Sequence, residues 1–237
     1  PRQPGLHVFD DYPLAELVEC IDWTPFFQAW ELAGKFPAIL TDEVVGTQAS
    51  ELYRDARAML DRIVSDKWLT AKAVFGLWPA NSVGDDVELM VDGRAERLHF
   101  LRQQVDKPAD RPDFCLADFI APRDSGKQDW IGMFAVTAGI GIDAHVARFE
   151  ADHDDYNAIL LKALADRLAE AFAECLHQRV RTDLWGYAPH EALSREQLIA
   201  EQYQGIRPAP GYPACPDHSV KRAMFDLLQC QDIGMGL

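Results

Sequence analysis

The longest regular feature of the sequence is an apolar stripe at helical spacing between residues 153 and 181. Its members recur every three or four positions and therefore share one face of a helix, while Asp166, Glu170 and Glu174 recur every fourth residue on another face. A helix with so long an apolar face has to pack against a further layer of structure. The stripe consists of Tyr156, Ile159, Leu160, Ala163, Leu164, Leu168, Phe172, Cys175, Leu176 and Val180.

Upstream of this helix, the sequence indicates one further helix and a group of short strands. The apolar positions of residues 45–65 have helical spacing, and β-like runs follow at residues 73–78, 87–91, 96–101 and 129–137. The link between the first two runs is short, and Asp92-Gly93 is a tight-turn signal between the second and third, so we expect antiparallel pairing rather than crossover helices. The predicted fold is a single α+β domain in which helices pack about an antiparallel sheet.

The two ends of the chain differ in character from this centre. Residues 1–13 contain three prolines and no periodicity, which predicts a linker from an upstream domain and leaves residues 14–237 for the domain itself. Ser194 and Gln197 have the spacing of a capping box for a helix that runs towards Tyr203. A last helix is expected over residues 218–229, with apolar residues that a continuation of the chain would cover.

Composition excludes several classes of partner. The formal net charge is −15 with a pI near 4.8, so a nucleic-acid backbone or an anionic membrane would be repelled. The N-terminus lacks the features of a signal peptide, and no apolar run approaches a membrane span. The five cysteines are dispersed with no C-x-x-C pair, which argues against a disulfide framework and favours a reducing, cytoplasmic location.

Two groups of motifs have a plain structural interpretation. Gly139-Ile-Gly141 with Ala144 imitates a dinucleotide fingerprint, but a long helix follows it in place of a second parallel strand, so a strand-to-helix turn is favoured. The segments 153–155 and 215–218 carry histidine with aspartate or cysteine, yet neither has a partner pair at zinc spacing. We therefore expect no bound metal and no catalytic residues.

The segment Arg207-Pro-Ala-Pro-Gly211-Tyr212 is the best candidate for a binding site. It belongs to a stretch, residues 205–216, with four prolines and two glycines, which predicts a stiff loop. A guanidinium on such a loop can hold a carboxylate in a two-pronged contact with little loss of chain entropy. Gly211 permits close backbone approach, and Tyr212 offers a flat ring with a hydroxyl. By physics alone, the same pattern is compatible with ordinary surface structure.

This R-x-x-x-G-Y segment resembles the signature of the activation domain of cobalamin-dependent methionine synthase. Further runs resemble that family in the same order, from about residue 20 to residue 237. These runs are residues 21–27 (IDWTPFF), 78–86 (WPANSVGDD), 115–122 (CLADFIAP), 153–174 (HDDYNAILLKALADRLAEAFAE) and 201–218 (EQYQGIRPAPGYPACPDH).

The resemblance implies a function in reactivation of an oxidised cofactor. In that family the domain binds S-adenosylmethionine and presents its methyl group to cobalamin on the neighbouring domain. One electron from a flavodoxin-type or diflavin reductase, together with that methyl group, converts inactive cob(II)alamin to methylcobalamin. The domain's own task is positioning and electrostatics, without acid–base chemistry.

Carried over position by position, the resemblance implies a set of seven ligand contacts. Arg207 suits the ligand's carboxylate, while the acidic members suit its ammonium or ribose hydroxyls in an order that stays open. Each acidic residue also has a simpler interpretation: Asp22 as a helix cap, Glu170 as a solvated carboxylate, and Glu201 as an exposed helical side chain. The set is Asp22, Glu170, Glu201, Arg207, Ala209, Gly211 and Tyr212.

The sequence departs from the full enzyme in two respects. It contains no D-x-H-x-x-G cobalamin-ligand motif and no zinc-thiolate cluster, so we expect no methionine synthesis by this chain alone. The resemblance also places its end inside the activation domain. Two alternatives stay open: a free-standing S-adenosylmethionine-binding partner acting in trans, and a docking domain whose ligand site has decayed.

Overall fold

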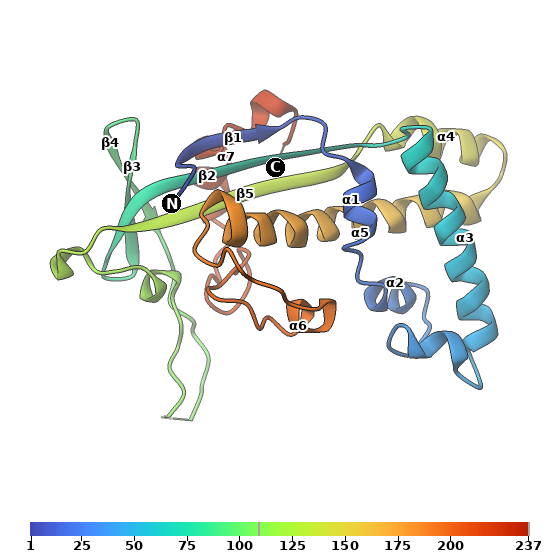
Figure 1. Cartoon of the computed structure of the whole chain (residues 1–237), viewed down its shortest axis with the longest axis horizontal. Coiled ribbons are helices and arrows are strands. Elements are labelled where there is room, and N and C mark those ends of the chain that lie inside the picture. Colours follow the sequence, from blue (N-terminus) through green and yellow to red (C-terminus); the bar gives the residue numbers. More distant parts are fainter. Residues whose placement is uncertain (109, 237) are drawn as a thin grey trace. The chain divides into compact units, whose positions relative to one another are not determined.

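The computed structural model describes residues 1–108 and 110–236, and it has the predicted α+β architecture (Figure 1). Within these residues one sheet has the strand order β1-β2-β3-β4, with β5 paired to β2. The strands are β1 (Gly5–Phe9), β2 (Thr70–Val83), β3 (Asp86–Val91), β4 (Arg94–His99) and β5 (Asp129–Ile140). The helices are α1 (Leu14–Val18), α2 (Thr24–Ala29), α3 (Gly46–Ser65), α4 (Ile142–Ala151), α5 (Asp155–Arg179), α6 (Arg195–Ile199) and α7 (Val220–Leu227).

The chain divides into two compact units, and each is described by itself. Unit 1 comprises residues 1–8, 74–135 and 177–237, and unit 2 comprises residues 9–73 and 136–176. The division falls within β1, β2, β5 and α5, so each of these elements contributes residues to both units.

The hairpins of unit 1 confirm the predicted antiparallel pairing. Strand β3 pairs antiparallel with β2, where Ala80 lies opposite Leu89, and also with β4. The turn between β3 and β4 is Asp92-Gly93, with φ values of 49° and 80°. Two successive residues at positive φ are typical of the tight turn whose twist matches that of the strands it joins.

The core of unit 1 lies where this meander meets the C-terminal segment. Val87, Leu89 and Leu98 of the hairpin are buried together with Val220 and Leu228. The remaining apolar residues of the last helix, Ala223, Met224, Phe225 and Leu227, are partly buried against the same core. These four residues pack against the core but stay partly exposed, so the expectation that a continuation of the chain would cover this helix stays a prediction.

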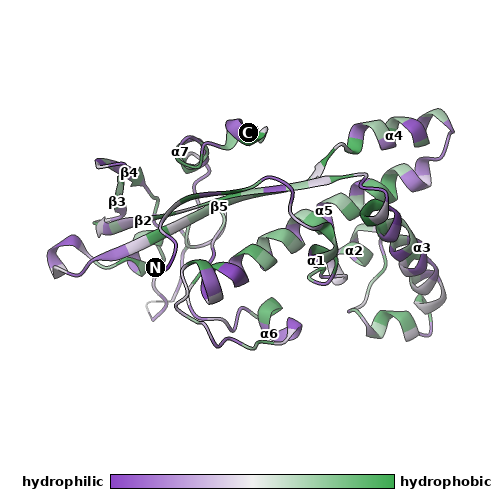
Figure 2. Cartoon of the chain, turned by 45° about the horizontal axis from the view of Figure 1, so that its top comes forward, coloured by the Kyte–Doolittle hydropathy of each residue, from purple (hydrophilic) through white to green (hydrophobic). Residues whose placement is uncertain are grey.

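Unit 2 is built around α3 and the first part of α5. Helix α3 matches the predicted segment closely, and it buries Leu52, Ala56 and Met59. It carries hydrophilic residues as well, whereas α5 is hydrophobic along much of its length (Figure 2). An aromatic cluster surrounds the start of α2, with ring centroids 4.8 to 6.4 Å apart; its members are Trp23, Phe26, Phe27, Phe36 and Tyr53.

Two predicted element boundaries and one expected burial pattern are corrected. Residues 1–13 are expected to be irregular, but Gly5–Phe9 forms β1, because backbone pairing to β2 does not require an apolar repeat. The helix after Ser194 ends at Ile199 rather than near Tyr203. The apolar stripe of α5 is buried over most of its length, but Ala163 is half-buried, and Tyr156 and Ile159 at its start are exposed.

The cysteines also differ from expectation. Cys20 and Cys175 form a disulfide within unit 2, with Cα atoms 6.5 Å apart. A separation of 155 residues gives the sequence no sign that the two thiols meet, since disulfide geometry is a property of the folded chain. Cys115, Cys215 and Cys230 are free and buried.

Candidate ligand-binding site

The R-x-x-x-G-Y segment lies in an irregular stretch of unit 1 between α6 and α7, as predicted. The preceding helix begins at the predicted capping box, in which the Ser194 hydroxyl accepts from the Gln197 amide and the Gln197 side chain accepts from the Ser194 amide. Glu201 terminates this helix in a left-handed conformation with φ of 53°. From there the prolines exclude regular structure, so turns and side-chain contacts alone fix the loop.

A compact double turn holds the second half of the loop. The Gly211 amide donates to the Cys215 carbonyl at 2.7 Å, and the Tyr212 amide donates to the Ala209 carbonyl at 3.0 Å. The Cys215 amide donates back to the Tyr212 carbonyl at 2.8 Å. Because Cys215 itself is buried in the core of unit 1, these three bonds tie the exposed turn to the folded body.

Gly211 occupies a position that requires glycine on two counts. Its φ is +104°, a conformation that residues with a Cβ rarely adopt. A Cβ built there would also lie 2.6 Å from Cε1 of His218. The glycine of the motif therefore serves the shape of the turn, and His218 is packed against its backbone.

Arg207 and Tyr212, the arginine and the tyrosine of the motif, differ in how far their side chains are exposed. Tyr212 is 64% exposed, so its ring is available to a flat ligand. Arg207 is half-buried, with a buried Nε, and is followed by Pro208-Ala209-Pro210. Partial burial lowers the effective dielectric around its guanidinium and strengthens its attraction for an anion.

A buried ionic cluster centred on Arg181 contacts the chain at Tyr203, just before the proline-rich loop. The Nε and Nη2 atoms of Arg181 donate to the two carboxylate oxygens of Glu191 at 2.7 and 2.6 Å. Its Nη1 donates to Nδ1 of His177 at 2.6 Å, and its guanidinium lies 4.4 Å from the ring centroid of Tyr203. The Arg181 side chain is 0% exposed and that of Glu191 6%, so the charge of this arginine is satisfied inside the protein.

His177 is a neutral member of this cluster. Arginine has no acceptor, so Nδ1 of His177 must accept, which assigns the ring proton to Nε2. Burial, followed by the positive charges of Arg181 and Arg207, lowers the pKa of His177 to about 3. Because the charge of Arg207 helps to lower the pKa of His177, the motif arginine interacts electrostatically with the buried cluster.

Tyr187 fixes the part of the loop that lies between the cluster and Arg207. Its hydroxyl donates to the Gln204 carbonyl at 3.1 Å. Gly205, at φ of +91°, brings its backbone so close to that hydroxyl that a Cβ would lie 2.9 Å from it. Burial is the main cause of a raised pKa for Tyr187, so this phenol stays a hydrogen-bond donor.

The structure gathers five of the seven predicted contact residues on this one loop: Glu201, Arg207, Ala209, Gly211 and Tyr212. Asp22 and Glu170 lie in unit 2. Asp22 is half-buried at the start of α2, where its Oδ1 accepts from the Thr24 amide at 3.0 Å, so it does make the cap-like bond that the simpler interpretation expects. Glu170 is exposed on α5. Their contact with a ligand stays a prediction.

Sequence reasoning missed the buried cluster. His177 and Arg181 lie four residues apart, which places them on one helical face, and this spacing was the available signal. An arginine directly after the apolar stripe has the ordinary interpretation of a solvated helix end. Only the fold shows that Arg181 meets Glu191 and Tyr203, because these contacts join residues 10 and 22 positions apart across turns and the short helix α6.

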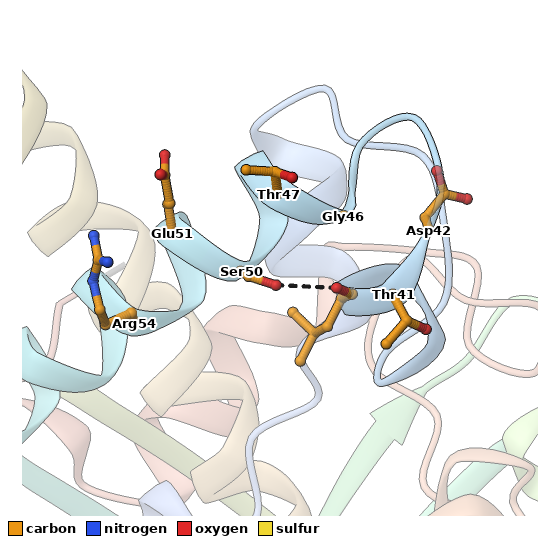
Figure 3. A pocket seen from close by; sticks show the side chains of 8 residues that line it. Thr41, Asp42, Gly46, Thr47, Ser50, Glu51 and Arg54 are labelled. Carbon is orange, nitrogen blue, oxygen red and sulfur yellow. Dashed lines mark hydrogen bonds between the residues drawn. The ribbon is translucent and has the colours of Figure 1, made fainter.

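A separate open depression of about 570 Å³ lies at the start of α3 in unit 2 (Figure 3). Its polar groups serve local structure: Oδ1 of Asp42 accepts from the amides of Val44 and Val45, and the Ser50 hydroxyl donates to the Leu40 carbonyl. It contains none of the residues that the sequence assigns to a site. The predicted ligand residues therefore lie elsewhere, most of them on the proline-rich loop.

The fold and this loop define an α+β domain with a proline-stiffened loop that carries a half-buried arginine and an exposed tyrosine. A model of the family described as the vitamin B12-dependent methionine synthase activation domain matches residues 13–237. Among solved structures, the MetH reactivation domain bound to AdoHcy is similar, with a TM-score of 0.93 and 54% sequence identity; the match covers 99% of this chain and 73% of that chain. The chain belongs to the activation-domain family of vitamin B12-dependent methionine synthases, which are methyltransferases.

Proposed function

We propose that this chain binds S-adenosylmethionine and supports the reductive methylation of cob(II)alamin to methylcobalamin. The observation that carries the proposal is the loop around Arg207, which belongs to a chain 54% identical to a reactivation domain bound to AdoHcy, the demethylated product of the same ligand. When bound, S-adenosylmethionine supplies a methyl group activated by a sulfonium.

The chemistry of the loop fits this ligand. S-adenosylmethionine carries a carboxylate, an ammonium, two ribose hydroxyls and a flat adenine. Arg207 supplies a two-pronged donor for the carboxylate, and Tyr212 supplies an exposed ring and hydroxyl. Gly211 lets the backbone approach the ligand, and the Ala209 carbonyl is already engaged by the Tyr212 amide, which fixes the turn's shape.

The acidic residues complete the proposed contact set. Glu201, Asp22 and Glu170 suit the ammonium group or the ribose hydroxyls, since carboxylates accept from both. The formal net charge of −15 also favours a ligand with a cationic sulfonium over an anionic one. These residues bind and orient the ligand, and no proton transfer by them is required.

The proposed partners follow from this role. The cobalamin-binding domain of methionine synthase would receive the methyl group, and a flavodoxin-type or diflavin reductase would supply the electron. We propose that the setting is cytoplasmic and that the chain does not make methionine by itself. Within residues 1–108 and 110–236, none of the helices is long and apolar enough for a bilayer.

Calorimetric titration of the chain with S-adenosylhomocysteine and S-adenosylmethionine tests the proposal. We expect saturable binding of both at one site per chain, with weaker binding of 5′-methylthioadenosine, which lacks the carboxylate that Arg207 would hold. Absence of binding by either adenosyl amino acid would contradict the proposed function and favour a docking domain whose ligand site has decayed.

A further inference from the structure

The loop that bears Arg207 is held at a point upstream of the motif as well as within it. Downstream, the double turn from Ala209 to Cys215 fixes the chain. Upstream, Tyr203 contacts the buried cluster through its ring: the Arg181 guanidinium is 4.4 Å from the ring centroid, and the His177 ring meets it edge-on at 4.8 Å. Arg207 thus stands between two anchors, four residues after the first.

The first anchor rests on a cluster that three side-chain hydrogen bonds hold together. Glu191 accepts from Arg181 through both carboxylate oxygens, and His177 accepts through Nδ1. These bonds fix the plane of the guanidinium, and a cation held over an aromatic face fixes the ring in turn. The turn of π-helix at Val180–Leu184, which directs Arg181 inward, is an irregularity often found at functional positions.

The charge arrangement also suits an arginine that must hold an anion. Arg181 is neutralised by Glu191, and His177 is neutral because its Nδ1 accepts a hydrogen bond. The buried cluster therefore presents little net charge beside Arg207. A ligand carboxylate at Arg207 would meet the positive charge of that arginine without a competing anion from Glu191, whose two oxygens are engaged.

We propose that Arg181 is a positioning residue for ligand binding, which acts through the Tyr203 ring to preorganise Arg207 for a carboxylate. The inference rests on the proposed function and deepens it, because it names residues outside the R-x-x-x-G-Y motif that set the motif's affinity. If Arg181 holds the loop in place before the ligand arrives, the loop loses less conformational entropy when the ligand binds.

The test is a double-mutant cycle measured by calorimetric titration with S-adenosylhomocysteine. Tyr203→Leu removes the ring and is expected to weaken binding about tenfold or more, the scale of coupling between neighbouring residues. Tyr203→Phe keeps the ring over Arg181 and is expected to bind within about threefold of the parent. Combined with Arg207→Ala, Tyr203→Leu is expected to add less than about twofold, because its effect requires Arg207.

Arg181→Met removes the positioning residue itself and is expected to weaken binding as Tyr203→Leu does. Thermal melting of every variant shows whether a loss of binding comes from a loss of folding. Arg181→Met leaves Glu191 buried without its partner, so it can fail to fold, and Tyr203→Leu then carries the test. Arg102→Met is the matched control, since Arg102 is likewise paired with carboxylates in unit 1, those of Asp85 and Asp118, and lies in a different loop. It is expected to bind as the parent does.

The outcomes separate the inference from the proposed function. If the parent binds and Arg207→Ala weakens binding, but Tyr203→Leu binds as tightly as the parent, the positioning role is wrong. It is also wrong if the effects of Tyr203→Leu and Arg207→Ala multiply in full. If the parent binds no S-adenosylhomocysteine, the proposed function fails and the inference fails with it.

Discussion

Cys20 and Cys175 are joined by a disulfide that ties the chain just before α2 to helix α5 within unit 2. Each cysteine neighbours a predicted ligand residue: Asp22 lies two residues after Cys20, and Glu170 lies five residues before Cys175. The bond therefore links the two segments of this unit that the family resemblance assigns to the ligand.

Reduction of this disulfide is expected to destabilise the protein. A bond that closes so long a loop restricts the unfolded chain, so we expect the free energy of unfolding to fall by about 2–4 kcal/mol in reductant. Urea denaturation with and without a phosphine reductant measures the effect. The Cys20→Ser/Cys175→Ser double variant is the control, since reductant should leave its stability unchanged. Five titratable thiols in the unreduced, denatured parent would rule the bond out.

Substitution of Gly211 is expected to damage the loop. Gly211→Ala places a Cβ at a φ of +104° and against His218, and strain of this kind costs about 1–3 kcal/mol. We expect affinity for S-adenosylhomocysteine to fall about tenfold as the turn shifts. Gly84→Ala is the matched control: its φ is also positive, but nothing lies within 4 Å of the added carbon. If both variants bind alike, the shape of the turn at Gly211 is not what the ligand requires.

The buried histidine predicts a specific dependence of stability on pH. The pKa of His177 is about 3 in the folded protein, whereas an unperturbed histidine in the unfolded chain titrates near 6.5. Between these values the unfolded chain takes up a proton that the folded protein does not. Acidification below about pH 6.5 therefore lowers the free energy of unfolding, by at most about 1.4 kcal/mol per pH unit for this group.

The variant His177→Asn isolates this effect, because an amide can accept from Arg181 and does not titrate. Urea denaturation between neutral pH and about pH 5 should give a shallower loss of stability for the variant than for the parent. The comparison is between slopes, since the substitution also changes absolute stability. Equal slopes would mean that His177 takes up its proton in the folded state as readily as in the unfolded one.

The isolated chain is expected to show no methionine synthesis. Its sequence holds neither a D-x-H-x-x-G motif for cobalamin nor a zinc-thiolate cluster for homocysteine, which is the basis of this prediction. An assay of the purified chain with methylcobalamin, methyltetrahydrofolate and homocysteine measures this. Turnover above that of free methylcobalamin would show that the chain does more than bind and present a methyl donor.

Local signals in the sequence predict much of this fold. The spacing of residues 45–65 and 153–181, the Asp92-Gly93 turn and the Ser194 capping box each depend on neighbours in the chain, and each matches an observed element. The stiff loop is likewise a local consequence of its prolines.

The features that the sequence does not predict are the non-local ones. Strand β1 exists because its backbone pairs with β2, more than sixty residues away in the chain. The Cys20–Cys175 bond and the meeting of Arg181 with Glu191 and Tyr203 depend on where the chain returns in space. The motif therefore identifies Arg207, but only the folded chain reveals what holds its loop in place.

If Arg207 binds the carboxylate of an adenosyl amino acid, Arg207→Ala should lose affinity in calorimetric titration. We expect binding of S-adenosylmethionine to weaken by about 1.5–3 kcal/mol, the usual contribution of a hydrogen bond to a charged group. Arg123→Ala, at an exposed arginine elsewhere in unit 1, should bind as the parent does. Equal affinities for the parent and Arg207→Ala, with both proteins folded, would contradict the account.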